Sequence, residues 1–312
     1  MEIVSNRVGL VACSSYDATM LLERVDRLCQ AIDFSVARGS RVLLKPNLVS
    51  ARGKWQLACT HAAFVAAVAQ WCIEQGARVA VGDSPAFGSA RAVMAACGIS
   101  RALGGLPVEL VDFGEPQPVR LASGVTVGVA RQVLACDVLV NLPRVKAHDQ
   151  LYLTMAVKNH FGAVVGFRKA WLHARHGDIG NRFEAMLVDL LAVLPAGISL
   201  VDGVVAMHRS GPMGGSAFPM GVVAAGVNPV AVDTALMAVL GLPSEASPMA
   251  RECVRRGLPG SHLSELIFPL SRPEEVAVSG FVPPLRLAPV SFHPARLAIG
   301  AMKRIAIRLS GG

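Results

Sequence analysis

The chain has 312 residues, of which 53% are hydrophobic and 17% are charged, and its net charge is +8 with a pI near 9.5. Low charge with high apolar content excludes an intrinsically disordered chain and supplies enough side chains for one sizeable core. The basic residues are scattered and aromatic residues make up only 5%, so we expect no nucleic-acid surface built on stacking. The basic balance is compatible with a small anionic ligand.

The apolar stretches and the cysteines both indicate a cytoplasmic protein. The longest apolar runs, such as 221–227 and 235–242, are shorter than a membrane-spanning helix, and the first residues resemble a strand rather than a signal peptide. The seven cysteines include no C-x-x-C pair, so we expect no intrinsic iron–sulfur cluster. We therefore expect buried thiols, no transmembrane segment and a cytoplasmic location.

The first two hundred residues alternate short apolar runs with amphipathic stretches. Asp17 is expected to open the first helix and Gly39 to close it, and Thr60 is expected to cap the second. Apolar strands separated by helices predict an α/β fold with a mostly parallel sheet covered by helices on both faces. The expected strands are 8–13, 41–45, 78–82, 137–142 and 198–203, and the expected helices are 18–38, 61–75, 89–97 and 229–241.

Two segments depart from this alternation. Between 107 and 130, short strand-like pieces separated by Gly and Pro predict a hairpin insertion, which would be a small antiparallel element. The chain after about 243 is Pro-rich and irregular, and 296–309 can form a basic amphipathic helix. We expect a core over 1–242 and a C-terminal extension, 243–312, whose last helix either packs on the core or contacts a membrane surface or a partner.

Polar residues follow four of the predicted strands. Lys45 and Asn47 follow one strand, Asp83 follows another, the segment 144–149 follows a third, and the Gly-rich loop 210–221 comes after a fourth. The carboxyl ends of parallel strands meet at one edge of a sheet, where ligands of open α/β sheets bind. The sequence therefore predicts one convergent pocket at this edge.

Lysines are the expected anion-binding groups of the pocket. Lys45 directly follows an apolar strand, Lys146 shares its segment with His148, and Lys158 interrupts an apolar stretch beside Asn159. Each also has a structural interpretation, as a strand exit, a solvated loop or a surface residue. We expect the lysines to neutralise phosphate or carboxylate groups, and His148 to be the general acid or base because its reference pKa is near neutral.

Carboxylates and backbone amides complete the expected site. Asp83, Asp202 and Asp233 would orient lysines or coordinate a divalent metal, although Asp233 could instead complement the first turn of its helix. The loop amides could cradle an anion, but the loop matches neither the Walker pattern nor the dinucleotide fingerprint. The expected catalytic residues are His148, Lys146, Lys45, Lys158 and Asp83, and the expected binding residues are Asn47, Asn159, Asp202, His208, Arg209, Gly211, Gly214 and Asp233.

A pair of histidines forms a separate candidate. His173 and His176 are three residues apart and would share one helix face, as metal-ligating pairs do. The spacing fixes no third ligand for them. A divalent metal and ordinary helix histidines are therefore both open interpretations.

Six motifs, taken in order, resemble the family known as domain of unknown function 362. They are LLKPNLV (43–49), VGDSPAFG (81–88), DVLVNLPRVKAH (137–148), LTMAVKNHFGAVVG (153–166), LVDGVVAM with SGPMGG (200–215) and NPVAVDTALMAVLGL (228–242). The resemblance covers about 7–242 and implies a cytosolic prokaryotic protein without implying a reaction. The motifs include Lys45, Asn47, Asp83, Lys146, His148, Lys158, Asn159, Asp202, Gly211, Gly214 and Asp233.

The chain departs from that family in two respects. Many members carry ferredoxin-type cysteine clusters, which this chain lacks, and His208-Arg209 stands where an acidic and a small polar residue are expected. Three functions stay open: an enzyme acting on an anionic metabolite, a non-catalytic carrier of a metal or cofactor, and a redox partner subunit that relies on an iron–sulfur protein in trans. A carrier would depend on His173 and His176 more than on His148.

Overall fold

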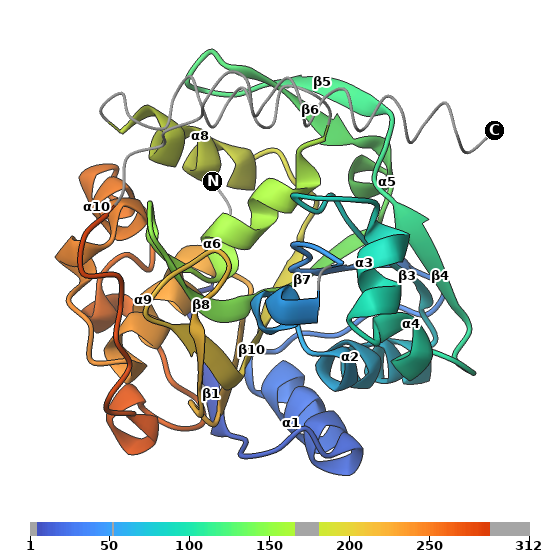
Figure 1. Ribbon diagram of the computed structural model, residues 1–312, viewed down its shortest axis with the longest axis horizontal. Helices are drawn as coiled ribbons and strands as arrows, with labels where there is room; N and C mark the ends of the chain where they lie inside the picture. Colours follow the sequence, from blue (N-terminus) through green and yellow to red (C-terminus); the bar gives the residue numbers. More distant parts are fainter. Residues whose placement is uncertain (1–4, 52, 166–180, 288–312) are drawn as a thin grey trace.

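The computed structural model describes residues 5–51, 53–165 and 181–287, and one large sheet lies at its centre (Figure 1). Its strand order is β1-β12-β10-β7-β2-β3-β4, while β8 and β11 pair with β10, and β9 pairs with β8. A separate hairpin joins β5 to β6. The strands are β1 (Gly9–Ala12), β2 (Arg41–Pro46), β3 (Arg78–Asp83), β4 (Val108–Asp112), β5 (Pro116–Arg120), β6 (Thr126–Ala130), β7 (Val138–Leu142), β8 (Arg144–His148), β9 (Tyr152–Thr154), β10 (Gly197–His208), β11 (Ser216–Phe218) and β12 (Val222–Gly226).

The middle of the sheet is parallel. β2, β3, β4 and β7 run in one direction, and the first part of β10 is parallel to β7. β12 and β1 add an antiparallel margin beside β10. The predicted fold class, a mostly parallel α/β sheet with a small antiparallel element, is confirmed, and the carboxyl ends of the parallel strands lie at one edge.

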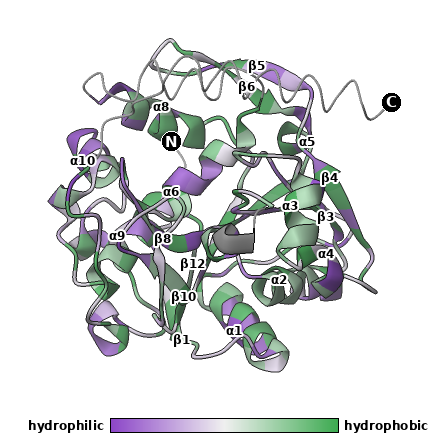
Figure 2. Ribbon diagram, in the orientation of Figure 1, coloured by the Kyte–Doolittle hydropathy of each residue, from purple (hydrophilic) through white to green (hydrophobic). Residues whose placement is uncertain are grey.

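Helices cover both faces of this sheet. Val42 and Leu44 of β2 pack into the core that holds α1 and α2, whereas Leu43 packs into the core that holds α8, because successive side chains of a strand point to opposite faces. Figure 2 shows hydrophobic and hydrophilic residues together on α1, as expected of an amphipathic surface helix. The helices are α1 (Ala18–Ala31), α2 (Ala62–Glu74), α3 (Ala90–Ala96), α4 (Ile99–Ala102), α5 (Arg131–Leu134), α6 (Ala156–Asn159), α8 (Arg182–Leu191), α9 (Pro229–Val239) and α10 (Pro248–Arg255), and the 3₁₀ turns are η1 (Gly53–Ala58), η2 (His160–Ala163), η3 (Ser244–Ala246), η4 (Leu263–Glu265) and η5 (Pro273–Val276).

Two helix ends differ from the sequence prediction. α1 stops at Ala31 rather than at residue 38, because Asp33 adopts a left-handed conformation with φ 56°. α2 is capped by His61, whose Nδ1 accepts from the Ala63 amide, and not by Thr60. The Thr60 hydroxyl instead donates to the Leu142 carbonyl, so it ties the start of α2 to the end of β7.

Two segments also differ from their predicted form. Residues 144–149 were expected as a loop, but 144–148 form the buried strand β8, because the long strand β10 continues beyond β7 and offers a further pairing edge. Within 107–130, the hairpin spans β5 and β6, while β4 pairs with β3 as a parallel edge strand. Further along the chain, α10 packs on α8 and α9.

One described stretch, Gln56–Glu74, is long and apolar enough by length and composition to cross a membrane. The short apolar runs of the chain had predicted no transmembrane segment, so this stretch differs from the prediction. In the fold, Phe64, Val65 and Val68 of this stretch are fully buried in the core, and 56% of its apolar window lies inside the structure. A buried core helix satisfies the same length and composition test. This stretch includes α2, which packs on the sheet as such a core helix.

Candidate functional site

The carboxyl edge of the sheet holds a buried polar cluster with two parts. We call its first part the lysine group, which lies at the ends of β2, β3 and β7 and on β8 and α6. We call the second part the arginine group, which connects β8 and β10 to α2 and to the loop before α1. The lysine group consists of Lys45, Asn47, Asp83, Asn141, Lys146 and Asn159, and the arginine group consists of Arg144, Asp202, Tyr16 and His61.

A buried ion pair lies at the base of the lysine group. Lys45 Nζ is 2.9 Å from Asp83 Oδ1, and both side chains are essentially inaccessible to solvent. The Leu48 amide donates to the other carboxylate oxygen at 3.0 Å, and burial lowers the pKa of Lys45. A Cβ at Gly162 would collide with both charged groups, so this glycine lets η2 lie directly on the pair.

Three asparagines form a hydrogen-bonded chain across the same edge. Asn47 Nδ2 donates to Asn159 Oδ1 at 2.7 Å, and Asn159 Nδ2 donates to Asn141 Oδ1 at 2.8 Å. Asn141 Nδ2 in turn donates to Ser199 Oγ at 3.0 Å. Because these residues lie on separate elements, the chain fixes the relative positions of β2, α6, β7 and β10.

Lys146 is the cation of the lysine group that has no carboxylate partner among the described residues. Its Nζ donates to the Asn47 side-chain oxygen and to the Ala58 carbonyl, the latter at 2.8 Å. Only 2% of the residue is exposed, and no described carboxylate lies within ion-pair distance of it. Burial lowers the pKa of Lys146 to about 8.

The arginine group is charge-matched. Arg144 Nε lies 3.9 Å from Asp202 Oδ2, and the Tyr16 hydroxyl donates to Asp202 Oδ1 at 2.8 Å. The His61 amide donates to Asp202 Oδ2 at 2.9 Å, and the His61 and Tyr16 rings stack with centroids 3.5 Å apart. Each oxygen of the buried carboxylate therefore has a donor.

The two groups together hold an excess of positive charge. Three buried cations, Lys45, Arg144 and Lys146, face two buried carboxylates, Asp83 and Asp202. The remaining source of negative charge among the described neighbours of Lys146 is the Cys59 thiol, whose pKa is lowered to about 6, chiefly by a hydrogen bond from Cys97. The charge of this edge therefore depends on the state of one cysteine.

His148 lies on the same face of β8 as Lys146, since alternate residues of a strand share a face. Its Nδ1 accepts hydrogen bonds from the amides of Gln150 and Leu151, both at 3.2 Å. That nitrogen therefore organises the turn after β8 and is not available to a ligand. His148, the predicted general base, therefore lies beside this turn, two residues after Lys146.

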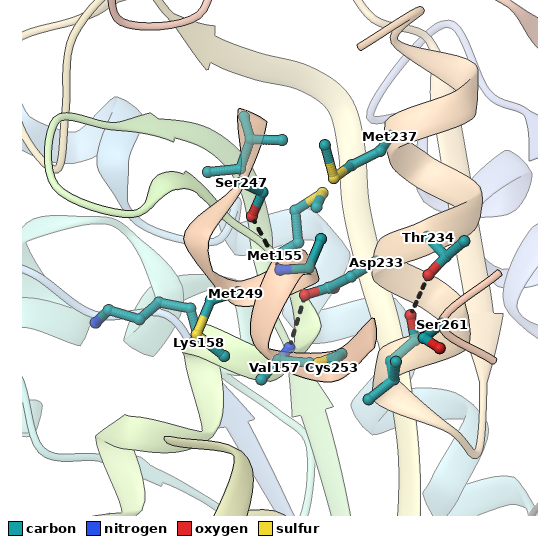
Figure 3. A pocket seen from close by; sticks show the side chains of 13 residues that line it. Met155, Val157, Lys158, Asp233, Thr234, Met237, Ser247, Met249, Cys253 and Ser261 are labelled. Carbon is teal, nitrogen blue, oxygen red and sulfur yellow. Dashed lines mark hydrogen bonds between the residues drawn. The ribbon is translucent and has the colours of Figure 1, made fainter. Parts of the chain in front are cut away.

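Asp233 and Lys158 lie apart from the lysine group, at the contact between α6 and α9 (Figure 3). Asp233 accepts from the amides of Ala156 and Val157, at 2.7 and 3.2 Å, so it caps α6. Burial raises its pKa to about 7. Lys158 Nζ lies 5.0 Å from the Phe161 ring centroid and points away from the cavity that Asp233 lines. That cavity is about 20 Å³, which admits one water and no substrate.

The predicted Gly-rich loop lies against the turn after β8. The Gly211 amide donates to Asp149 Oδ1 at 2.8 Å, and Gly211 lies too close to the Ala147 carbonyl for a side chain. His208 packs between Phe218 and Phe281, with ring centroids 5.3 and 5.9 Å away. Arg209, directly before the loop, and Gly214 within it are exposed, and both have positive φ.

The predicted metal pair, His173 and His176, and the basic segment 296–309 lie outside the described residues. Within 5–51, 53–165 and 181–287, no group of three His, Cys, Asp or Glu side chains could hold a metal ion. The predicted metal-coordinating role of Asp83 and Asp202 therefore has no third ligand there, and both carboxylates are engaged by cations and amides.

Several residues of the edge were not among the predicted site residues. Asn141 and Arg144 interrupt an apolar run, which was a usable signal, whereas Tyr16 and His61 had none. His160 is buried beside Lys45, and burial lowers its pKa to about 3. Its Nδ1 has no hydrogen-bond partner among the described residues, so it is a neutral acceptor or donor that a ligand could engage.

The chain is similar to known proteins over most of its length. Residues 42–238 match the family called domain of unknown function (DUF362). A thylakoid-associated protein of Synechocystis, sll1697, is 36% identical over 305 residues, which are 96% of this chain and 95% of that protein.

Two solved structures align with part of the chain. A protein from Thermotoga maritima and the lactate racemase apoprotein from Thermoanaerobacterium thermosaccharolyticum both align with a TM-score of 0.41 at 9% identity. The alignments cover 64% and 65% of this chain, and the chain spans about half the length of either structure, 53% and 51%.

Proposed function

The chain belongs to the DUF362 family, whose name specifies no reaction, and we propose from its own residues that it is an enzyme of small-molecule metabolism. Its substrate would carry a phosphate or carboxylate group that binds at the lysine group. The observation that carries this proposal is Lys146, a buried ammonium without a carboxylate partner in the described chain. A buried charge is costly unless it is partnered, and an anionic ligand would supply that partner.

The surroundings of Lys146 support an acid–base role for its amine. A pKa of about 8 keeps the amine mainly protonated at neutral pH but allows it to release a proton readily. We assign this role to Lys146 in preference to His148, because the Nδ1 of His148 already accepts two backbone amides. Proton transfer next to the anionic group of the substrate is the chemistry that this arrangement favours.

The lysine group reaches the surface at half-buried positions. Asn47 and Gly162 are partly exposed, while Lys45, Asp83 and Lys146 behind them are buried. A substrate that entered here would meet the Asn47 amide and the unpartnered Nδ1 of buried His160 near Lys45. These polar groups would fix its orientation while the lysines neutralise its charge.

Titration calorimetry with orthophosphate and with malonate tests the binding step. We expect the wild type to bind at least one of them at pH 7 and to bind it less tightly above about pH 8, where Lys146 loses its proton. Lys146→Met should weaken binding at least tenfold. The matched control is Arg78→Met, since Arg78 is an exposed cation at the opposite end of β3. Equal affinities of the wild type and Lys146→Met would overturn the proposal.

The catalytic step requires its own measurement. Wild-type protein incubated in D₂O with a panel of phosphorylated and carboxylated metabolites should incorporate deuterium into, or convert, one that it binds. Lys146→Met should not. Tight stoichiometric binding without exchange or product would show that the protein is a carrier and not an enzyme. Activity that needs an added iron–sulfur protein would show that it is a redox subunit.

The location of the protein is also a proposal. We place it in the cytoplasm, and the name of the Synechocystis relative adds association with the thylakoid as the specific alternative. Fractionation of cells at low and high salt distinguishes the two, because electrostatic attachment of a basic protein to an anionic membrane is lost at high salt.

A further inference from the structure

Two cysteines next to the lysine group lie in direct contact. Cys59 follows η1 and Cys97 follows α3, and their thiols share a hydrogen bond. Gln56 Nε2 donates to the Ala96 carbonyl at 2.8 Å, which holds the two segments together one residue away from Cys97. We infer that Cys59 and Cys97 form a redox-active dithiol that closes to a disulfide.

The environment of Cys59 stabilises a thiolate. Its Sγ accepts from the Val49 amide at 3.3 Å and from the Ser50 amide, in addition to the Cys97 thiol. Lys146 lies nearby, since its Nζ binds the carbonyl of the preceding residue, and Arg144 Nη1 donates to the Cys59 carbonyl at 2.9 Å. Two amide dipoles and the Lys146 ammonium therefore favour negative charge at this sulfur.

Access to the pair is through Cys97. Cys59 is fully buried, whereas Cys97 is half-buried at the end of α3. The shared hydrogen bond holds the proton of the pair on Cys97 and raises the pKa of that thiol. Cys97 therefore becomes a nucleophile only when this proton passes to Cys59, which leaves the thiolate on the sulfur that an oxidant can reach. Return of the proton to the leaving group then frees Cys59 as the second nucleophile.

The reaction balances with an external disulfide as oxidant. The Cys97 thiolate attacks one sulfur of the oxidant, which forms a mixed disulfide and releases one thiol. The Cys59 thiolate then attacks Cys97 Sγ, which forms the Cys59–Cys97 bond and releases the second thiol. The protein loses two protons and two electrons, and the oxidant takes them up to become two thiols.

A second pair of cysteines in the same chain provides a built-in contrast. Cys29 of α1 and Cys72 of α2 interact across a core contact, and both are fully buried. Burial raises the pKa of both thiols, that of Cys72 to about 12. No described cation is near enough to oppose that effect, so this pair should stay reduced under the same conditions.

Oxidised glutathione is the probe for the test. Full-length reduced protein is treated with it at pH 7, denatured in acid and alkylated with a maleimide, and the peptides are mapped by mass spectrometry. We expect one Cys59–Cys97 disulfide, five alkylated cysteines of the original seven, and full reversal by dithiothreitol. Cys136→Ser is the matched control, because Cys136 is also half-buried but has no cysteine partner, and it should leave the disulfide unchanged.

Single variants separate the two steps. Cys59→Ser should stop at one glutathione adduct on Cys97, and Cys97→Ser should leave Cys59 unmodified. Seven alkylated cysteines in the wild type, or an adduct on Cys97 that accumulates in the wild type as it does in Cys59→Ser, would overturn the inference. Circular dichroism melting confirms that each variant is folded.

A consequence for the anion site rests on the proposed function. The disulfide removes the thiolate nearest to Lys146, so orthophosphate should bind more tightly to the oxidised protein than to the reduced protein. The peptide map reports the disulfide independently of any ligand. A disulfide without a change in phosphate affinity would therefore contradict the proposed function alone.

Discussion

Lys146 at the sheet edge and Asp233 at the contact between α6 and α9 are both held inside the fold, but their partners differ. Asp233 receives two backbone amides at the start of α6, and a helix start is a favourable place for a carboxylate. Lys146 donates to a neutral side chain and a carbonyl, and no described carboxylate pairs with it. Burial alone therefore does not identify a ligand site; a buried cation without a carboxylate partner is the more specific sign.

The largest expected effect on stability comes from the buried ion pair between Lys45 and Asp83. Lys45→Met leaves the Asp83 carboxylate buried without its cation, which should lower the free energy of unfolding by about 3–5 kcal/mol. Arg41→Met breaks the exposed pair with Asp137, which solvent screens, and should lower the free energy of unfolding far less. Urea unfolding measures both, and equal losses would contradict the distinction between buried and exposed pairs.

Lys146 should make stability rise with pH. Its pKa is about 8 in the folded state and 10.5 in the unfolded state, so between these values the unfolded chain holds the extra proton. The free energy of unfolding should therefore increase by about 3 kcal/mol from pH 8 to pH 10.5 through this group. The increase should be absent in Lys146→Met, and the difference between the two urea midpoints at each pH isolates it.

The Asp233 carboxyl should make the free energy of unfolding fall as pH rises. Its pKa is raised from 3.8 to about 7, so between these values the folded state holds the extra proton and stability falls as pH rises. Because the residue is only half-buried, we expect a decrease of about 1–3 kcal/mol from pH 4 to pH 7 relative to Asp233→Asn. Parallel stability curves of the two proteins would show that the cap offsets the cost of burial.

The smallest effect concerns the turn after β8. His148→Ala removes the acceptor of the Gln150 and Leu151 amides and should lower the free energy of unfolding by about 1–2 kcal/mol. His148→Asn keeps an acceptor and should lose less. Thermal melts of both variants check this, and phosphate affinity near that of the wild type would agree with Lys146 as the main binding group.

Local patterns in the chain were sufficient to predict the sheet and five of the six residues of the lysine group. Apolar runs that end in a charged or amide residue, as at Lys45 and Asp83, indicate strands that enter a common edge, because parallel strands all end there. Asn47, Lys146 and Asn159 were found by the same argument. The structure brings these five together, as contacts between β2, β3, β8 and α6.

The helix ends and the strand β8 could not be predicted in this way. Thr60 and His61 are both acceptable caps by composition, and only the position of the Leu142 carbonyl takes Thr60 away from α2. The segment 144–148 is polar enough for a loop, and its strand form depends on pairing with β10, more than fifty residues later. Such pairings leave no local signal.

The sequence by itself determined which residues form strands and helices and which polar groups lie at strand ends, since these follow from patterns within a few residues. Only the tertiary structure decided which of those groups meet. In the structure, Tyr16 contacts Asp202 and Cys59 contacts Cys97. Asp233 and Lys158 lie away from the lysine group, at the contact between α6 and α9. The physical reason is that charge compensation inside a protein depends on distances between remote segments, which the packing of the whole sheet and its helices establishes.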